Sequence, residues 1–141
     1  MLSYKSRLQK LRKQMQAKNI DVSLINQTDE FQNEFLPIYS QRLEWLTNFS
    51  GSAGEAIITM DNAYLFVDGR YTLQAKLEVN KSIFTICNYK DKTPTEILKS
   101  LKSKKINFGI DGNIISVKKF NYLTSELGKN ISIKLLKENL V

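Results

Sequence analysis

The chain has 141 residues, 42% hydrophobic and 25% charged, so it is long enough to bury a hydrophobic core and is most simply one domain. Its single cysteine, Cys87, and its lack of histidine exclude an internal disulfide framework, histidine metal ligands and histidine-dependent nucleophilic catalysis. No apolar run approaches the ~20 residues that span a bilayer, and the basic N-terminus lacks the apolar stretch of a signal peptide; we therefore expect a cytoplasmic protein without membrane contact.

The net charge of +7 is unevenly distributed along the chain. Residues 1–20 hold six basic and no acidic residues, residues 21–80 three basic and nine acidic, and residues 81–141 twelve basic and five acidic. The acidic middle would repel phosphate, so the excess lysines indicate solvated surface charge and no nucleic-acid partner. Nucleic-acid binding through the basic ends is the weaker alternative, and it would show a steep dependence on salt.

The first 25 residues predict a helix followed by a strand. Over residues 4–18, apolar side chains recur on one helical face at Tyr4, Leu8, Leu11 and Met15. Because this apolar stripe is narrow, we expect the helix to pack on a sheet and not on a membrane surface. Residues 21–25 predict the first strand.

Residues 26–40 show no regular pattern of apolar and polar positions. The carboxylates of Asp29, Glu30 and Glu34 would suit a metal ion, but no histidine or cysteine lies nearby to complete a site. The segment is therefore expected to be a solvated acidic loop. Ser40 is predicted to cap a helix over residues 41–47.

Residues 45–75 contain the only tryptophan and three of the six glycines. Within them, Glu55–Thr59 and Ala63–Val67 are short, β-favouring runs separated by a three-residue turn, which predicts an antiparallel hairpin. The second run is almost entirely apolar, so its strand is expected to be buried on both faces. The turn Gly51-Ser-Ala-Gly54 allows the backbone to approach another backbone or a ligand closely.

Arg70 lies between the strand ending at Val67 and a helix predicted over residues 71–77. Ligands of open α/β sheets bind at the carboxyl ends of strands, so Arg70 is a candidate for contact with a ligand. Alternatively, Arg70 forms a structural ion pair with Asp68 that holds the turn together. The residues alone leave both interpretations open.

The C-terminal half alternates strands and helices. Strands are predicted at residues 82–87, 104–110 and 131–135, and helices open at the Thr93–Glu96 capping box and at the Ser116 cap, the second closing at Gly128. Cys87, with no histidine to activate it, is expected to be a small core residue. The order of elements predicts an α/β domain with a mixed β-sheet flanked by helices.

Motifs of self-sufficient enzymes are missing. The sequence has neither a G-x-x-x-x-G-K phosphate loop nor a G-x-G-x-x-G fingerprint, and no pair of carboxylates stands out. We therefore predict no catalytic residue and no metal-binding residue in this chain.

Two motifs together resemble the N-terminal domain of Xaa-Pro aminopeptidases, which are proline-specific exopeptidases of the creatinase/prolidase ("pita-bread") superfamily. They are W-L-T-x-F-x-G-S-A-G at residues 45–54 and D-G-R-Y-x-x-Q-A at residues 68–75. The resemblance covers nearly the whole chain and includes T-D-E-x-Q-x-E at residues 28–34 and K-E-N-L-V at residues 137–141. One departure is Phe31, where many members have histidine, so any polar role of that side chain is lost.

The resemblance implies that residues 1–141 form a single non-catalytic first domain, the catalytic domain being absent from this chain. The parent protein would release the N-terminal residue that precedes proline, using two divalent metal ions, usually manganese, in its catalytic domain. This chain would bind no cofactor and would be inactive alone. Its expected partners are a peptide with proline at the second position, the catalytic domain of the same protein and further copies in a homo-oligomer.

The resemblance also assigns a role to Arg70, because the arginine of D-G-R-Y is implicated in contacting the bound peptide from outside the catalytic domain. A guanidinium suits this role, since it stays charged and presents a planar fork to a carboxylate or a carbonyl. Asp68 would orient Arg70, and Gly69 would allow the turn. The alternative function is a standalone peptide- or protein-binding module, as related domains in histone-chaperone proteins imply.

Overall fold

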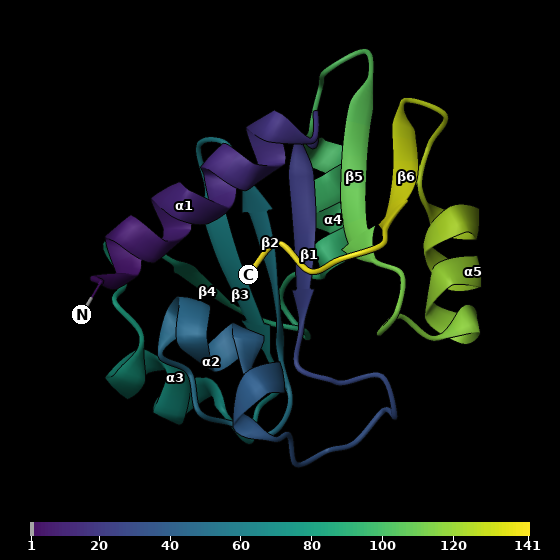
Figure 1. Ribbon diagram of the computed structural model, residues 1–141. Coiled ribbons are helices and arrows are strands. Elements are labelled where there is room, and N and C mark those ends of the chain that lie inside the picture. The colour runs from purple at the N-terminus through teal and green to yellow at the C-terminus, as the bar shows by residue number, and fades with distance from the viewer. Residues whose placement is uncertain (1) are drawn as a thin grey trace.

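A six-stranded mixed sheet with helices on both faces forms the centre of the fold (Figure 1). The computed structural model describes residues 2–141. The elements, in chain order, are α1 (Tyr4–Ala17), β1 (Val22–Asn26), the 3-10 helix η1 (Ile38–Ser40), α2 (Arg42–Thr47), β2 (Glu55–Thr59), β3 (Ala63–Val67), α3 (Thr72–Glu78), β4 (Thr85–Asn88), α4 (Pro94–Ser100), β5 (Ile106–Asp111), α5 (Val117–Glu126) and β6 (Ile131–Leu136).

The strand order is β4-β3-β2-β1-β5-β6, and every strand except β2 points the same way. The predicted hairpin is confirmed, with Ala56 opposite Leu65 in the antiparallel β2–β3 pair. The predicted α/β fold with a mixed sheet is also confirmed. Because five strands run in parallel directions, their carboxyl ends lie at one edge of the sheet, where β2 begins.

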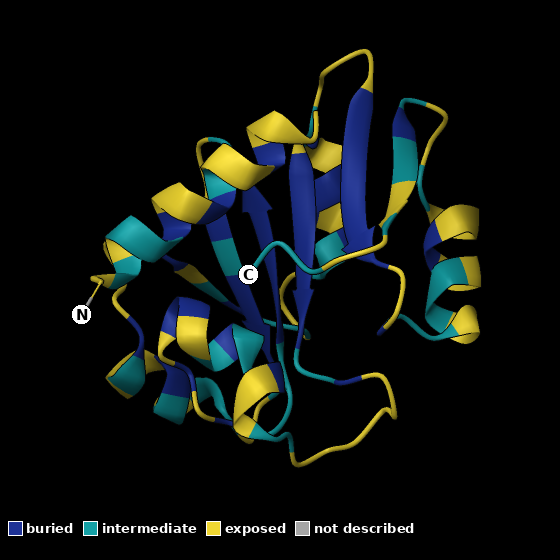
Figure 2. Cartoon of the chain, viewed as in Figure 1, coloured by how far each residue is buried: buried dark blue, intermediate teal, exposed yellow. Residues whose placement is uncertain are grey.

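Two hydrophobic cores lie on opposite faces of the sheet. On one face, α1, α2 and α3 cover Ile25, Ile58 and Leu65. On the other, α4 and α5 cover Ile57 and Phe108. Figure 2 shows the central strands as buried and the outer faces of the helices as exposed, which is the pattern expected of a sheet covered on both sides.

Three helices begin at the side-chain caps that local sequence favours. Ser3 Oγ accepts the Ser6 amide at 3.2 Å at the start of α1, and Ser116 Oγ accepts the Lys119 amide at 3.1 Å at the start of α5. The predicted capping box of α4 is confirmed, with the Thr93 amide donating to Glu96 at 2.9 Å.

Two predicted helix boundaries are wrong. Ser40 does not cap α2: it ends η1, its hydroxyl is buried without a partner among residues 2–141, and Gln41 takes the cap position. Gly128 does not close α5 in a left-handed conformation; the helix ends at Glu126, followed by an extended Leu127.

The start of β4 is also later than predicted. The strand begins at Thr85, three residues after the predicted start at Ser82. Asn80 Oδ1 accepts both the amide of Ser82 at 2.9 Å and its hydroxyl at 2.7 Å, which holds this segment in a turn.

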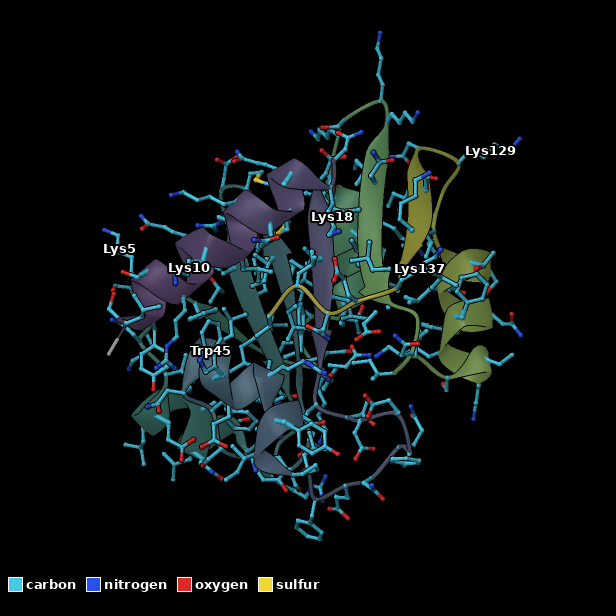
Figure 3. All side chains as sticks on the ribbon, in the orientation of Figure 1. Lys5, Lys10, Lys18, Trp45, Lys129 and Lys137 are labelled. Carbon is cyan, nitrogen blue, oxygen red and sulfur yellow. The ribbon has the colours of Figure 1, made fainter. Side chains whose placement is uncertain are left out.

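The lysines are spread over the surface. Of the five that Figure 3 labels, two lie on α1, one just after α1, one in the turn before β6 and one just after β6. This distribution agrees with solvated surface charge. Within residues 2–141, no helix combines the length and the apolar character that crossing a membrane requires.

Candidate functional site

Arg70 lies in the turn between β3 and α3, at the carboxyl edge of the sheet. The carboxylate of Asp68 accepts the backbone amide of Arg70 at 2.9 Å. It also accepts two hydrogen bonds from the guanidinium, from Nε at 3.1 Å and from Nη2 at 2.9 Å. The Arg70 side chain is nevertheless 68% exposed. The predicted ion pair is therefore present, and the rest of the guanidinium faces solvent.

Three segments distant in sequence meet around Arg70. The Arg70 Cζ atom lies 5.1 Å from the ring centroid of Tyr71, within the range of a cation–π contact. The Tyr71 hydroxyl shares a 2.6 Å hydrogen bond with Ser52, whose hydroxyl also donates to Glu34 at 3.3 Å. Residues 26–40, the glycine turn and the start of α3 thus form one polar cluster.

Asp68 and Arg70 stabilise each other's charged form. The side-chain hydrogen bond from Arg70 lowers the pKa of Asp68, and the same bond, aided by Asp68, Tyr71 and Glu34, raises the pKa of Arg70. Both partners stay ionised at neutral pH. Of the N–H groups of the guanidinium, Asp68 accepts only Nε–H and one N–H of Nη2, and the guanidinium makes no further hydrogen bond within residues 2–141. Its remaining donors can bind a carboxylate or a carbonyl.

The glycines of residues 51–54 serve the core of this domain. Phe49 is fully buried, and its ring packs edge-on against Tyr71 at 5.8 Å between centroids. A Cβ atom on Gly51 would lie 2.3 Å from Phe49 Cζ, and one on Gly54 would lie 3.1 Å from the Phe66 carbonyl oxygen. The close backbone approach that the sequence predicted is therefore made by Gly54, to the Phe66 carbonyl, whereas Gly51 packs on the Phe49 ring. This packing positions Ser52 beside Tyr71.

The turn does not require a glycine at position 69, contrary to prediction. Gly69 has no positive φ, and a Cβ atom there would meet only Asn88 Nδ2, at 4.0 Å. Asp68 and Arg70 hold the turn through their own hydrogen bonds.

The acidic loop differs from its prediction at one residue. Glu30 and Glu34 are exposed as expected, but Asp29 is buried. Its carboxylate accepts the amides of Phe31 and Asn33, each at 3.0 Å, and the Asn33 side-chain amide at 2.9 Å. Asp29 therefore organises the loop.

Acidification is expected to loosen this loop. The Asn33 amide, with the Asn33 side chain and the Phe31 amide, lowers the pKa of Asp29 below its ordinary value of 3.8. A lowered folded-state pKa means that the stabilisation is present above 3.8 and is lost as the pH falls through the lower value. The measurement is NMR hydrogen-exchange protection of the two amides as a function of pH.

Two variants control this measurement. Asp29→Asn is expected to weaken protection at every pH and to abolish its acid dependence, whereas Glu30→Gln, at an exposed position, should behave like wild type. Protection that does not change on acidification would contradict a role for the ionised Asp29 carboxylate.

The described residues, 2–141, form no metal site. Among residues 2–141, no three His, Cys, Asp or Glu side chains converge as a metal ion would require. Cys87 is a free, buried thiol whose pKa is raised by burial, as suits the core residue that the sequence predicted.

Comparison with known proteins gives a consistent picture. Residues 7–139 match the family model of the Creatinase/Prolidase N-terminal domain. The probable Xaa-Pro aminopeptidase P of Laccaria bicolor is 35% identical over 138 residues, which is 96% of this chain and 22% of that protein. The chain spans about a fifth of the length of the curated relatives it matches.

Solved structures share the fold. The X-prolyl aminopeptidase of Caenorhabditis elegans, described as a cytosolic enzyme with a di-nuclear active site, matches 99% of this chain and 25% of its own chain, with a TM-score of 0.88 and 22% identity. The N-terminal domain of the cytoplasmic peptidase PepQ from Mycobacterium tuberculosis matches 93% of this chain and 92% of its own, with a TM-score of 0.69 and 24% identity. At these identities the two likenesses show a common fold.

Proposed function

Because the chain belongs to the creatinase/prolidase N-terminal domain family, we propose that it is the non-catalytic N-terminal domain of a metal-dependent Xaa-Pro aminopeptidase. The parent protein releases the N-terminal residue that precedes proline. This domain borders the active site, contributes a substrate contact and takes part in oligomer assembly. The names of the relatives support the activity, and the C. elegans enzyme supports a cytosolic location and two metal ions.

The metal ions, manganese in this proposal, belong to the catalytic domain of the parent protein. The donor side chains of residues 2–141 do not fit such a centre, because no three of them converge. This chain would therefore contribute shape and charge at the mouth of the site.

The observation that carries the proposal is the exposed guanidinium of Arg70. Asp68 fixes its plane by two hydrogen bonds, and the cation–π contact with Tyr71 limits its rotation. An arginine oriented in this way loses little conformational freedom when its free N–H groups bind a peptide carbonyl or carboxylate.

Arg70→Ala is expected to lower kcat/KM of the full-length parent protein by about ten- to a hundredfold for an Xaa-Pro peptide, because one charge-assisted hydrogen bond contributes roughly 1.5–3 kcal/mol. Steady-state kinetics measures this. Lys76→Ala, an exposed cation on α3, is the matched control and should leave kcat/KM unchanged.

A comparison with Asp68→Ala separates substrate contact from a structural role. If Arg70 only neutralises Asp68, both variants should be equally impaired. If Arg70 contacts the peptide, Arg70→Ala should be the more impaired of the two. Equal, small effects in both variants would overturn the assignment of Arg70.

The isolated 141-residue chain is expected to show no manganese-dependent cleavage of an Xaa-Pro peptide, because its carboxylates do not converge on a metal site within the described residues. The measurement is product release by chromatography, with a full-length Xaa-Pro aminopeptidase as the positive control. Robust hydrolysis by the chain itself would refute its non-catalytic role.

A standalone binding module is the second candidate function, and exposed apolar side chains of residues 31–39 favour it. Phe31 and Phe35 are 77% and 80% exposed, and Ile38 and Tyr39 are exposed beside them. Calorimetric titration of the isolated chain with proline-containing peptides tests this function. Saturable binding that is lost in Phe31→Ser/Phe35→Ser would favour the module.

A further inference from the structure

A cavity of about 400 Å³ lies between the sheet and the helices α4 and α5, on the face opposite α1. Its floor is apolar and is formed by Leu24, Ile57, Leu98, Phe108 and Leu123. The volume falls within the roughly 300–1,000 Å³ that small-molecule sites occupy. The cavity is thus large enough for a compact apolar group.

A smaller polar hollow of about 210 Å³ adjoins this cavity, and the two share Glu55, Tyr89, Ser116 and Lys119. The Glu55 side chain is 10% exposed and is ion-paired with Lys119. The Tyr89 hydroxyl donates to Glu55 Oε1 at 3.0 Å. Burial, and then the Glu55 charge, raise the pKa of Tyr89, so its phenol keeps the proton that it donates.

This cluster has hydrogen-bonding capacity that the chain does not fill. Asn26 stands directly opposite Glu55 across the β1–β2 pair, so both side chains lie on the same face of the sheet. Asn26 is only 8% exposed, yet its Oδ1 atom accepts no hydrogen bond within residues 2–141, and it lines the polar hollow. A buried acceptor without a donor is costly, and a ligand that supplies one removes the cost.

The ion pair can bind ligand groups without being broken. The Glu55 carboxylate has lone pairs beyond those used by Tyr89 and Lys119, and the Lys119 ammonium has N–H groups beyond the one directed at Glu55. A half-buried pair of opposite charges beside an apolar cavity matches a ligand that carries both charges and an apolar substituent.

We propose that this cavity binds a free amino acid with a large apolar side chain. The α-ammonium group binds Glu55 and the free Oδ1 of Asn26, and the α-carboxylate binds Lys119. The side chain of the ligand enters the apolar floor. The inference does not rest on the proposed function, because every residue involved belongs to this chain and none is hydrogen-bonded to Arg70, Asp68 or Tyr71.

The direct test is a calorimetric titration of the 141-residue chain with L-leucine and L-phenylalanine. Both are expected to bind saturably. Glycine lacks the apolar group, N-acetyl-L-leucine lacks the ammonium and L-leucinamide lacks the carboxylate. Each is expected to bind about tenfold more weakly or worse, as the loss of one charge-assisted contact or of apolar burial implies.

A pair of double variants tests the residues. Glu55→Gln/Lys119→Met removes both charges together and is expected to weaken L-leucine binding about tenfold or more. The matched control is Glu126→Gln/Lys99→Met, which makes the same changes in the exposed ion pair between α5 and α4 and should bind like wild type.

The proposal is overturned if neither amino acid binds saturably, if glycine binds as well as L-leucine, or if the Glu55→Gln/Lys119→Met chain binds unchanged. The three altered ligands probe the same contacts on the wild-type chain, so the proposal remains testable even if that variant fails to fold. Weaker binding of all three altered ligands to the wild-type chain, and of L-leucine to the variant, supports it.

Discussion

Gly51→Ala is expected to lower the free energy of unfolding by about 2–3 kcal/mol, as overpacking of a close-packed core does. The new Cβ atom would lie 2.3 Å from Phe49 Cζ and 2.9 Å from both Cε atoms of that ring. Phe49 cannot move away easily, because it is fully buried and its ring packs against that of Tyr71. Denaturant unfolding followed by circular dichroism measures the change.

Gly69→Ala is the matched control. A methyl group at position 69 would have no neighbouring atom closer than 4.0 Å, and Gly69 does not have a positive φ. The free energy of unfolding should therefore change by less than about 0.5 kcal/mol. Phe49→Leu in the Gly51→Ala background should recover part of the loss, because a smaller side chain makes room for the methyl group. Equal stability of the two alanine variants would disprove the steric account of the motif.

Lys119→Met is expected to cost roughly 2–3 kcal/mol of unfolding free energy, because it leaves the Glu55 carboxylate buried without its cation. The cost falls below the ~3–5 kcal/mol of fully buried pairs, since Lys119 is partly exposed. Thermal and denaturant unfolding at neutral pH measure it. Adding Glu55→Gln should restore most of the stability, because no unpaired charge then remains.

The corresponding surface change shows whether burial is the cause. Lys99→Met removes the exposed ion pair in which Lys99 Nζ lies 3.3 Å from Glu126 Oε2. It should lower the free energy of unfolding by less than about 0.5 kcal/mol. A similar loss in both lysine variants would mean that Glu55 is as well solvated as Glu126.

Local signals predicted most of the fold. The Thr93 capping box, the Ser116 cap and the hairpin over residues 55–67 are formed by atoms only a few residues apart, so the sequence contains their whole cause. The predicted Ser40 cap was wrong because Ser40 is the last residue of the 3-10 helix η1 and so cannot take the cap position of α2. The prediction that Asp29 is solvated was wrong because its carboxylate accepts hydrogen bonds from the backbone amides of its own loop.

The candidate site was predicted only where its members are neighbours in sequence. Asp68 and Arg70 are two residues apart, so their pairing could be foreseen, whereas the link from Tyr71 through Ser52 to Glu34 depends on the folded chain. Glu55 and Lys119 are 64 residues apart. Their only trace in the sequence is Glu55, a charged residue directly before the apolar run Ala56-Ile-Ile58.

The position of β1 inside the sheet has a consequence for synthesis on the ribosome. β1 can pair with β2 as soon as the hairpin has emerged, but its other neighbour, β5, follows much later, with Val22 opposite Phe108. Until then, the nascent chain presents β1 as an open edge that another chain could join. Completion of β5 and β6 closes it and leaves only β4 and β6 as outer strands, so premature termination before residue 106 would yield an aggregation-prone fragment.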